Sequence, residues 1–214
     1  MRRAIFYDLD GTLVDSEADN ADVISRVLAA LGKTASAAER RFVVGHSWNE
    51  VHALVCKNHA LTIARHDLIA LAVRERAAVA QERGVRALPG AQEVPRRLGS
   101  RFLQTVVSGS SREEVALSLA AIGIADLFHG FVASEDYARG KPSPDPYQTA
   151  LSRFAVLPHE ALAIEDTSDG IAAAHAAGLC VAAVRAGCTP GEDQSAADFV
   201  GDTLFDVETW INRL

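Results

Sequence analysis

Cysteine is scarce in this chain of 214 residues, which contains three: Cys56, Cys180 and Cys188. The number is odd, and the three do not show the short spacings typical of metal ligands. These features favour small buried or half-buried thiols in a reducing cytoplasm over a metal site.

Long apolar runs are also missing. No segment approaches the roughly 18 apolar residues that a membrane-spanning helix needs. The apolar run that follows Met1-Arg2-Arg3 stops at Asp8, which is too short for the core of a signal peptide. We therefore expect a cytoplasmic protein that does not contact a membrane.

The chain has fewer basic than acidic residues: 21 Lys and Arg against 28 Asp and Glu, which gives a formal net charge of −7. A phosphate backbone requires a basic face, so the charge argues against a nucleic-acid partner. A small anionic substrate remains possible, since a local pocket of lysine and amide groups is enough to bind it. The oligomeric state does not follow from the sequence.

The most informative stretch begins with the apolar residues Ala4 to Tyr7, which predict a short buried strand. Asp8-Leu9-Asp10-Gly11-Thr12 follows directly. Residues two apart in a strand face the same side, and two buried carboxylates are costly unless a metal ion or a reaction uses them. The motif therefore predicts either a metal site or a nucleophile beside an acid–base group.

The remaining chain divides by its periodicity. Residues 16–85 carry helical patterns and no convincing strand, whereas from Leu103 onward short apolar strands alternate with helices. That alternation predicts an α/β fold with a parallel sheet covered on both faces. Ligands of such sheets bind beyond the carboxyl ends of the strands. The expected strands are 103–107, 131–133, 161–164, 180–184 and 199–200, and the expected later helices are 111–122, 144–154, 168–177 and 204–214.

Three further motifs stand at predicted strand ends or in the loops after them: Val106-Val107-Ser108-Gly109-Ser110, Gly140-Lys141-Pro142 and Ile164-Glu165-Asp166-Thr167. Together with Asp8 to Thr12, they resemble the four signatures of the haloacid dehalogenase-like hydrolases, in the phosphoglycolate phosphatase and β-phosphoglucomutase-like branch. The resemblance implies a three-layer, Rossmann-like core from residues 1–15 and 86–214. It also implies a helical cap, a four-helix bundle, inserted at 16–85.

The resemblance and the chemistry of the residues suggest matching roles for the two acids of the first motif. An unperturbed aspartate has a pKa of about 3.9 and is ionised at neutral pH, so Asp8 is expected to attack phosphorus and form an aspartyl-phosphate. Asp10 is expected to protonate the leaving oxygen and then to activate water.

A metal site and a phosphate site are expected beside Asp8. Magnesium prefers a few carboxylates and shares phosphate oxygens, so we expect Mg²⁺ on Asp8, Asp166 and the main-chain carbonyl of Asp10, with Glu165 acting through water. Ser108 and the amide of Gly109 are expected to bind phosphate oxygens. Lys141 would offset the repulsion between carboxylate and phosphate, which is about 4 kcal/mol for two charges 4 Å apart at an effective dielectric of 20.

Substrate choice is expected to lie in the cap, because caps of this family close over the site and exclude water. The turn Gly45-His46-Ser47-Trp48 is its most suggestive stretch. The alternative is that His46 lies on the surface and that Trp48 packs inside the cap.

The expected function is Mg²⁺-dependent hydrolysis of a small phosphorylated metabolite, of the phosphoglycolate or sugar-phosphate type. A sugar phosphomutase is the first alternative. A dehalogenase would lack the second aspartate of the first motif. A non-catalytic protein that binds phosphate esters would have no need of Asp10.

Overall fold

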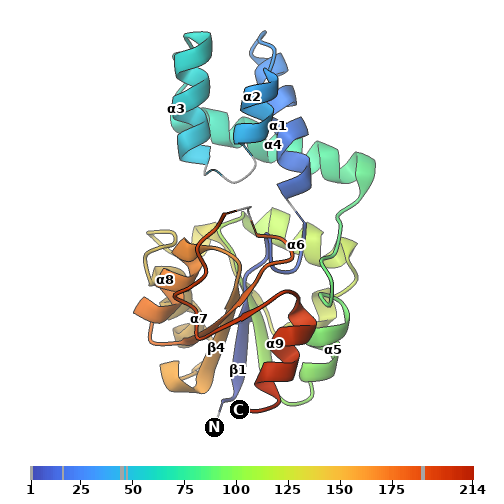
Figure 1. Ribbon diagram of the computed structural model, residues 1–214, viewed down its shortest axis with the longest axis vertical. Helices are drawn as coiled ribbons and strands as arrows, with labels where there is room; N and C mark the ends of the chain where they lie inside the picture. Colours follow the sequence, from blue (N-terminus) through green and yellow to red (C-terminus); the bar gives the residue numbers. More distant parts are fainter. Residues whose placement is uncertain (1, 16, 44–45, 47, 189–190) are drawn as a thin grey trace. The chain divides into compact units, whose positions relative to one another are not determined.

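The computed structural model describes residues 2–15, 17–43, 46, 48–188 and 191–214. The chain divides into two compact units, one made of residues 1–15 and 86–214 and the other of residues 16–85. Both are drawn in Figure 1. We call them the α/β unit and the helical unit.

A parallel sheet forms the centre of the α/β unit. Its strands in the described residues lie in the order β3-β2-β1-β4-β5-β6, and every neighbouring pair is parallel. The strands are β1 (Ala4–Tyr7), β2 (Leu103–Val107), β3 (Phe131–Val132), β4 (Ala161–Glu165), β5 (Cys180–Val184) and β6 (Phe199–Gly201). These bounds agree with the predicted strands to within one residue.

Strand β1 lies between β2 and β4 because both of its faces are apolar and fully buried. Ala4 and Phe6 point into the hydrophobic core that also contains Tyr147 and Ile171. Tyr7 lies in the opposite layer, where its hydroxyl donates to Oε1 of Gln104 at 2.7 Å. Successive side chains of β1 thus point to opposite faces of the sheet.

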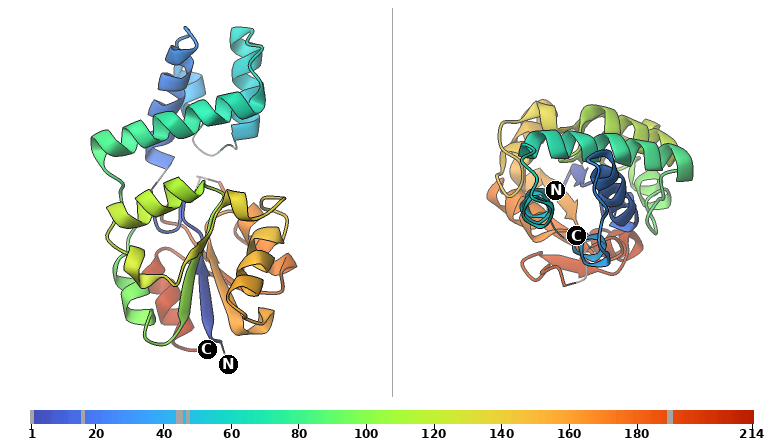
Figure 2. Two further views of the ribbon diagram at one scale, coloured as in Figure 1. Left: turned by 180° about the vertical axis from the view of Figure 1, so that it is seen from behind. Right: turned by 90° about the horizontal axis from the view of Figure 1, so that it is seen from above.

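Helices cover both faces of this sheet, as Figures 1 and 2 show. The α-helices described in this unit are α5 (Glu93–Leu98), α6 (Arg112–Ala121), α7 (Asp145–Arg153), α8 (Ser168–Ala176) and α9 (Leu204–Ile211). Short 3₁₀ turns are η1 (Ala125–Leu127), η2 (Ser134–Asp136) and η3 (Pro158–Glu160).

Two proline predictions had different outcomes. Pro95, for which the sequence favours a kink or a short first turn, lies in the first turn of the short helix α5, where a missing N–H costs nothing. Pro144 was expected at the first helical position of α7, and this was wrong, because Pro144 is the N-cap and the helix begins at Asp145.

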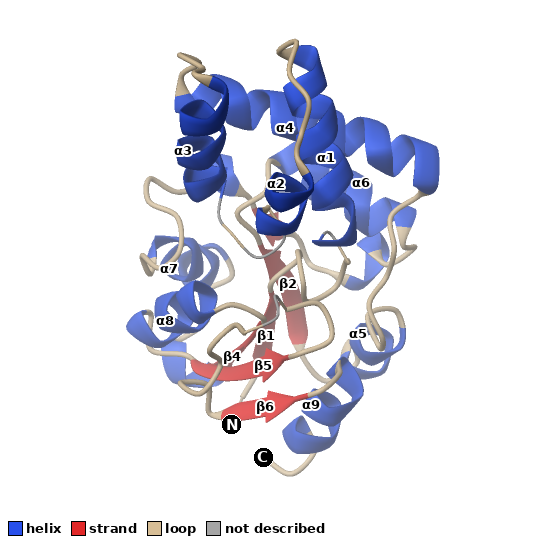
Figure 3. Ribbon diagram, turned by 45° about the horizontal axis from the view of Figure 1, so that its top comes forward, coloured by secondary structure: helices blue, strands red, loops and turns tan. Residues whose placement is uncertain are grey.

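The helical unit contains α1 (Glu17–Ala30), α2 (Ala37–Phe42), α3 (Trp48–His59) and α4 (Arg65–Arg83). None of its described residues belongs to a strand, as Figure 3 shows. Its core is a cluster of aliphatic side chains from α1, α3 and α4, such as Val23, Val51 and Leu68, together with Val43, which follows α2. The predicted fold class, an α/β core with an inserted helical segment, is therefore confirmed.

Two predictions about small features were also checked. The three cysteines are free and half-buried. No helix in the described part of the chain is both long and apolar enough to cross a membrane.

Candidate active site

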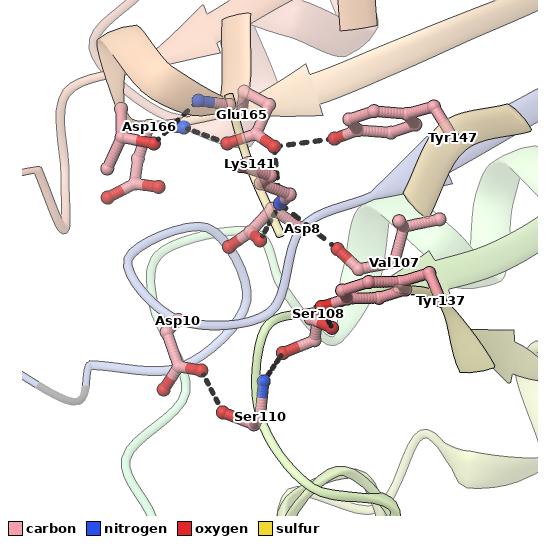
Figure 4. A network of polar contacts seen from close by, with 12 residues as sticks. Asp8, Asp10, Val107, Ser108, Ser110, Tyr137, Lys141, Tyr147, Glu165 and Asp166 are labelled. Atoms are coloured by element: carbon pink, nitrogen blue, oxygen red, sulfur yellow. Dashed lines mark hydrogen bonds and ion pairs between the residues drawn. The ribbon is translucent and has the colours of Figure 1, made fainter. Parts of the chain in front are cut away.

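The sheet order brings three motifs to one edge. Because β1, β2 and β4 are adjacent and parallel, the residues at their carboxyl ends are neighbours. Asp8 follows β1, Ser108 follows β2, and Glu165 is the last residue of β4. All three are buried, with exposed fractions of 7%, 1% and 0%. Figure 4 shows them converging with Lys141.

Lys141 joins the acids of β1 and β4. Its Nζ lies 2.5 Å from Oδ1 of Asp8 and 2.5 Å from Oε1 of Glu165. It also donates to the backbone carbonyl of Val107 at 3.2 Å. The ammonium group is thus held between three strand ends, and it is not the solvated surface lysine that a lone lysine usually is.

The site has several carboxylates and one lysine, and the pKa values of two of its acids are raised. Burial raises the pKa of Asp8 to about 8, with Glu165 and Asp10 adding to the rise and Lys141 opposing it. Burial and the charge of Asp8 also raise the pKa of Asp166. A buried carboxylate among others needs more positive charge than Lys141 supplies, so without a cation the pKa of Asp8 lies above that of a free aspartate.

A divalent cation fits this cluster. Asp8, Glu165 and Asp166 each offer a carboxylate oxygen, and the three oxygens lie within 4.8 Å of one another. All three side chains are buried. Hard oxygen ligands of this kind suit Mg²⁺, and a cation would lower the raised pKa values again. The carbonyl of Asp10 as a further ligand stays a prediction.

Two glycines allow the acids to approach so closely. A Cβ on Gly11, whose φ is +81°, would collide with the carboxylate of Asp166. A Cβ on Gly170, in the first turn of α8, would collide with the carboxylate of Glu165. The close approach of the acids thus requires glycine at both positions.

Asp10 points to a different partner from Asp8. Strand β1 ends at Tyr7, so the alternation of a strand does not extend to Asp10. Its Oδ2 accepts a hydrogen bond from Oγ of Ser110 at 2.7 Å. The carboxylates of the two acids therefore contact different residues, Lys141 and Ser110 (Figure 4).

The loop after β2 carries Ser108 and Gly109, the two residues predicted to bind phosphate. The amide of Ser110 donates to Oγ of Ser108 at 3.0 Å, so the hydroxyl proton of Ser108 stays available as a donor. Gly109 is exposed next to it. The hydroxyl of Tyr137 donates to the carbonyl of Ser108 at 2.9 Å and holds the loop.

Three supporting side chains of the site were not predicted from the sequence: Ser110, Tyr137 and Tyr147. The hydroxyl of Tyr147 donates to Oε1 of Glu165 at 2.5 Å, and the Nζ of Lys141 lies 5.4 Å from the centre of its ring. Burial and the charge of Glu165 raise the pKa of Tyr147 well above its ordinary value, so the phenol remains a donor. Ser110 stood within a quoted motif, whereas no sequence signal marked the tyrosines.

The two residues predicted for substrate choice lie in the helical unit. His46 is exposed, its Nδ1 lies 2.7 Å from the carbonyl of Phe42, and its ring stacks on that of Phe42. Trp48 is half-buried and packs against the core of the unit. The neighbouring Gly45 and Ser47 lie outside the described residues.

Comparisons with known proteins identify the family. The family model for "Haloacid dehalogenase-like hydrolase" matches residues 5–184. Validoxylamine A 7'-phosphate phosphatase from Streptomyces hygroscopicus subsp. limoneus is 31% identical over 185 residues, covering 85% of each chain. Hexitol phosphatase A from Escherichia coli is 31% identical over 193 residues, covering 86% of this chain and 83% of its own.

A solved structure extends the likeness to the whole chain. CbbY from Rhodobacter sphaeroides in complex with phosphate superposes with a TM-score of 0.83 at 25% identity, covering 97% of this chain and 96% of its own. A variant of CbbY has also been solved in complex with xylulose-(1,5)bisphosphate, with a TM-score of 0.81.

Proposed function

The chain belongs to the haloacid dehalogenase-like hydrolases, and from its place among their phosphatases we propose that it hydrolyses a small phosphate monoester of the sugar-phosphate or phosphoglycolate type. The observation that carries the proposal is the position of Lys141, 2.5 Å from Asp8 and 2.5 Å from Glu165. An ammonium beside a carboxylate nucleophile is what attack on a phosphate dianion requires.

The proposed reaction has two steps, both centred on Asp8. In the first, an oxygen of Asp8 attacks phosphorus, and the bond from phosphorus to the leaving oxygen breaks. Asp10 gives its proton to that oxygen. In the second, water attacks the aspartyl-phosphate, its proton passes to Asp10, and inorganic phosphate leaves with Asp8 restored.

The other residues hold the phosphate and its charge. We propose that Ser108 and the amide of Gly109 donate to phosphate oxygens while Lys141 neutralises charge beside them. Mg²⁺ would be held by Asp8, Asp166 and Glu165, with the carbonyl of Asp10 as a further ligand. When bound, it supplies Lewis-acid stabilisation of the phosphoryl group.

The substrate class rests on the relatives. Two are named as a validoxylamine A 7'-phosphate phosphatase and a hexitol phosphatase, and CbbY has been solved in complex with phosphate and, as a variant, with xylulose-(1,5)bisphosphate. These ligands are polar, small and phosphorylated. We propose a substrate of the same kind, with the helical unit serving as the cap that selects it.

The test is a panel of phosphate esters assayed with Mg²⁺, containing phosphoglycolate, hexose phosphates, hexitol phosphates and a generic aryl phosphate. We expect release of inorganic phosphate, loss of turnover in excess chelator, and recovery when Mg²⁺ is added back. Full turnover in chelator would contradict the metal site, and inactivity on every ester with Mg²⁺ would contradict the function.

A second experiment tests the cap. His46→Ala removes an exposed ring, and Trp48→Ala removes a half-buried one. If either side chain selects the substrate, its variant changes the ranking of esters while sparing the aryl phosphate. A uniform loss that follows the melting temperature would assign Trp48 to packing alone.

A further inference from the structure

One hydrogen bond joins two loops of the site that lie 100 residues apart in the chain. Oγ of Ser110 donates to Oδ2 of Asp10 at 2.7 Å. We infer that Ser110 is a positioning residue that holds the carboxyl group of Asp10 in the orientation from which it transfers protons. The inference rests on the proposed function, in which Asp10 is the general acid and base.

Ser110 is itself held firmly. Its amide donates to Oγ of Ser108 at 3.0 Å, and its carbonyl accepts from the amide of Ser134 at 3.0 Å. The next residue, Ser111, is the N-cap of α6. With the backbone fixed on both sides, the hydroxyl of Ser110 needs only one rotation to reach Asp10.

The carboxylate of Asp10 is oriented by this contact. Among the described residues, the hydrogen bond from Ser110 is the one that the Asp10 carboxylate accepts. Asp10 is also only half-buried and lies beyond the end of β1. Without Ser110 its side chain can rotate toward solvent, and a misplaced catalytic group lowers the rate steeply.

The bond also decides which oxygen of Asp10 does the chemistry. Oδ2 accepts the hydrogen bond from Ser110, so Oδ1 is the oxygen left to carry the proton that Asp10 transfers. A fixed acidic oxygen protonates a leaving alkoxide efficiently, whereas a leaving group that is already a weak base needs no such help.

The experiment uses the different need of good and poor leaving groups for a general acid. The wild-type chain and Ser110→Ala are compared on aryl phosphates whose phenols span a wide range of pKa, together with an alkyl phosphate. The measured quantity is kcat/KM with Mg²⁺, because it reports on the first irreversible step, in which the leaving group departs. Its logarithm is plotted against the pKa of the leaving group.

We expect Ser110→Ala to make this plot steeper. Turnover of the alkyl phosphate should fall about ten-fold or more, since general acid catalysis contributes roughly 10²- to 10⁴-fold. Turnover of the most activated aryl phosphate should stay close to that of the wild type. Ser110→Thr retains a hydroxyl and should restore the slope, and in an Asp10→Asn background Ser110→Ala should change the slope no further.

Ser111→Ala is the matched control, because it removes the adjacent hydroxyl, which caps α6 and does not contact Asp10. It should lower the melting temperature and leave the slope unchanged. A parallel downward shift of the Ser110→Ala plot would overturn the inference while leaving the function intact. Failure of the wild type to hydrolyse any ester would overturn the function instead.

Discussion

Asp8 is the residue on which the proposed chemistry depends most. In the metal-free protein its pKa is raised to about 8 because the side chain is buried, whereas an unfolded chain ionises it near its ordinary value. A raised folded-state pKa means that, above the unfolded pKa, ionisation of this group opposes folding.

The variant Asp8→Asn should therefore lose turnover without losing the fold. We expect activity to fall by more than about 10³-fold, as is usual when a covalent nucleophile is removed. The melting temperature in chelator at neutral pH should be equal to that of the wild type or higher, because one buried acid has gone. Substantial turnover in the folded variant would contradict the mechanism.

Gly170 offers a second residue-scale test. It lies in the first turn of α8 with an ordinary backbone, where alanine would normally favour the helix by about 1 kcal/mol. A Cβ there would nevertheless collide with the carboxylate of Glu165. That carboxylate is the end of a side chain, so it can move, but moving it breaks its contacts with Lys141 and Tyr147.

We therefore expect Gly170→Ala to fold and to bind Mg²⁺ more weakly. The half-saturating Mg²⁺ concentration for turnover should rise about ten-fold, as is typical when the support of a metal ligand is disturbed. Measurement of activity against Mg²⁺ concentration checks this, with thermal unfolding as the control. An unchanged Mg²⁺ requirement would show that Glu165 has no part in the metal site.

At the residue scale the sequence predicted the acids and lysine of the site but not what holds them. Asp8, Lys141 and Glu165 stand in short motifs that can be found locally. The bonds of Ser110 to Asp10 and of Tyr147 to Glu165 join residues 100 and 18 positions apart. Such pairs are set by tertiary packing, which a single sequence does not display.

Among the elements, α2 and α3 of the helical unit are joined by one buried acid. Glu39 is 2% exposed, accepts from the amide and hydroxyl of Ser36 in a capping box, and accepts from Nδ2 of Asn58 at 2.9 Å. Burial alone would raise its pKa, but the hydrogen bonds of Ser36 and Asn58 outweigh burial and lower it to about 2. Glu39 thus stabilises the folded unit as long as it is ionised.

Glu39→Gln should destabilise the helical unit by about 3 kcal/mol at neutral pH, because one pKa unit corresponds to about 1.4 kcal/mol. Since the folded pKa is depressed, the advantage of wild type is complete above pH 4.5 and disappears as pH falls toward 2. Hydrogen exchange of the α2 and α3 amides in the full chain measures this.

Glu114→Gln is the control for that experiment. Glu114 closes the same kind of capping box on Ser111 in α6, and no further hydrogen bond to its carboxylate is seen within the described residues. Its loss should cost about 1 kcal/mol or less. Glu39 also lies beside His59, whose Nε2 is 2.9 Å from Oε1 of Glu39, so equal effects of the two variants would show that Asn58 and His59 add nothing.

Elements of both units were predictable for the same reason. Strands such as Cys180–Val184 are short and wholly apolar, and Ser36-Ala37-Ala38-Glu39 has the form of a capping box, which predicts the start of α2. The exact helix boundary was harder to predict. Proline favours a helix start, but Pro144 is the N-cap and not the first helical residue of α7.

At the scale of the whole molecule, the chemistry was easier to predict than the substrate. Every motif of the proposed reaction lies in the α/β unit, where a parallel sheet must gather the carboxyl ends of adjacent strands. The helical unit carries no comparable motif. Its sequence indicates a hydrophobic core around residues such as Val51, which says that it folds and not what it selects.

Hydrolysis and phosphomutase chemistry begin with the same aspartyl-phosphate, so the core motifs do not distinguish them. Residues elsewhere in the chain bear on the choice. Sugar phosphomutases that this chain resembles typically carry a histidine about five residues after the position of Asp15, and an arginine in the cap turn. Here Asp19-Asn20-Ala21 and the turn that contains His46 and Trp48 stand in those places. Asn20 is 5% exposed, and its Oδ1 accepts from Arg76 at 2.9 Å.

These differences favour water as the acceptor of the phosphoryl group. Asparagine cannot titrate near neutrality as an imidazole does, and an indole cannot clamp a second phosphate as a planar guanidinium can. We therefore expect release of inorganic phosphate and no interconversion of glucose 1-phosphate and glucose 6-phosphate. Phosphorus NMR with Mg²⁺ and a bisphosphate primer follows both products at once. If interconversion outpaces phosphate release, the second sugar and not water is the acceptor, and the chain is a mutase.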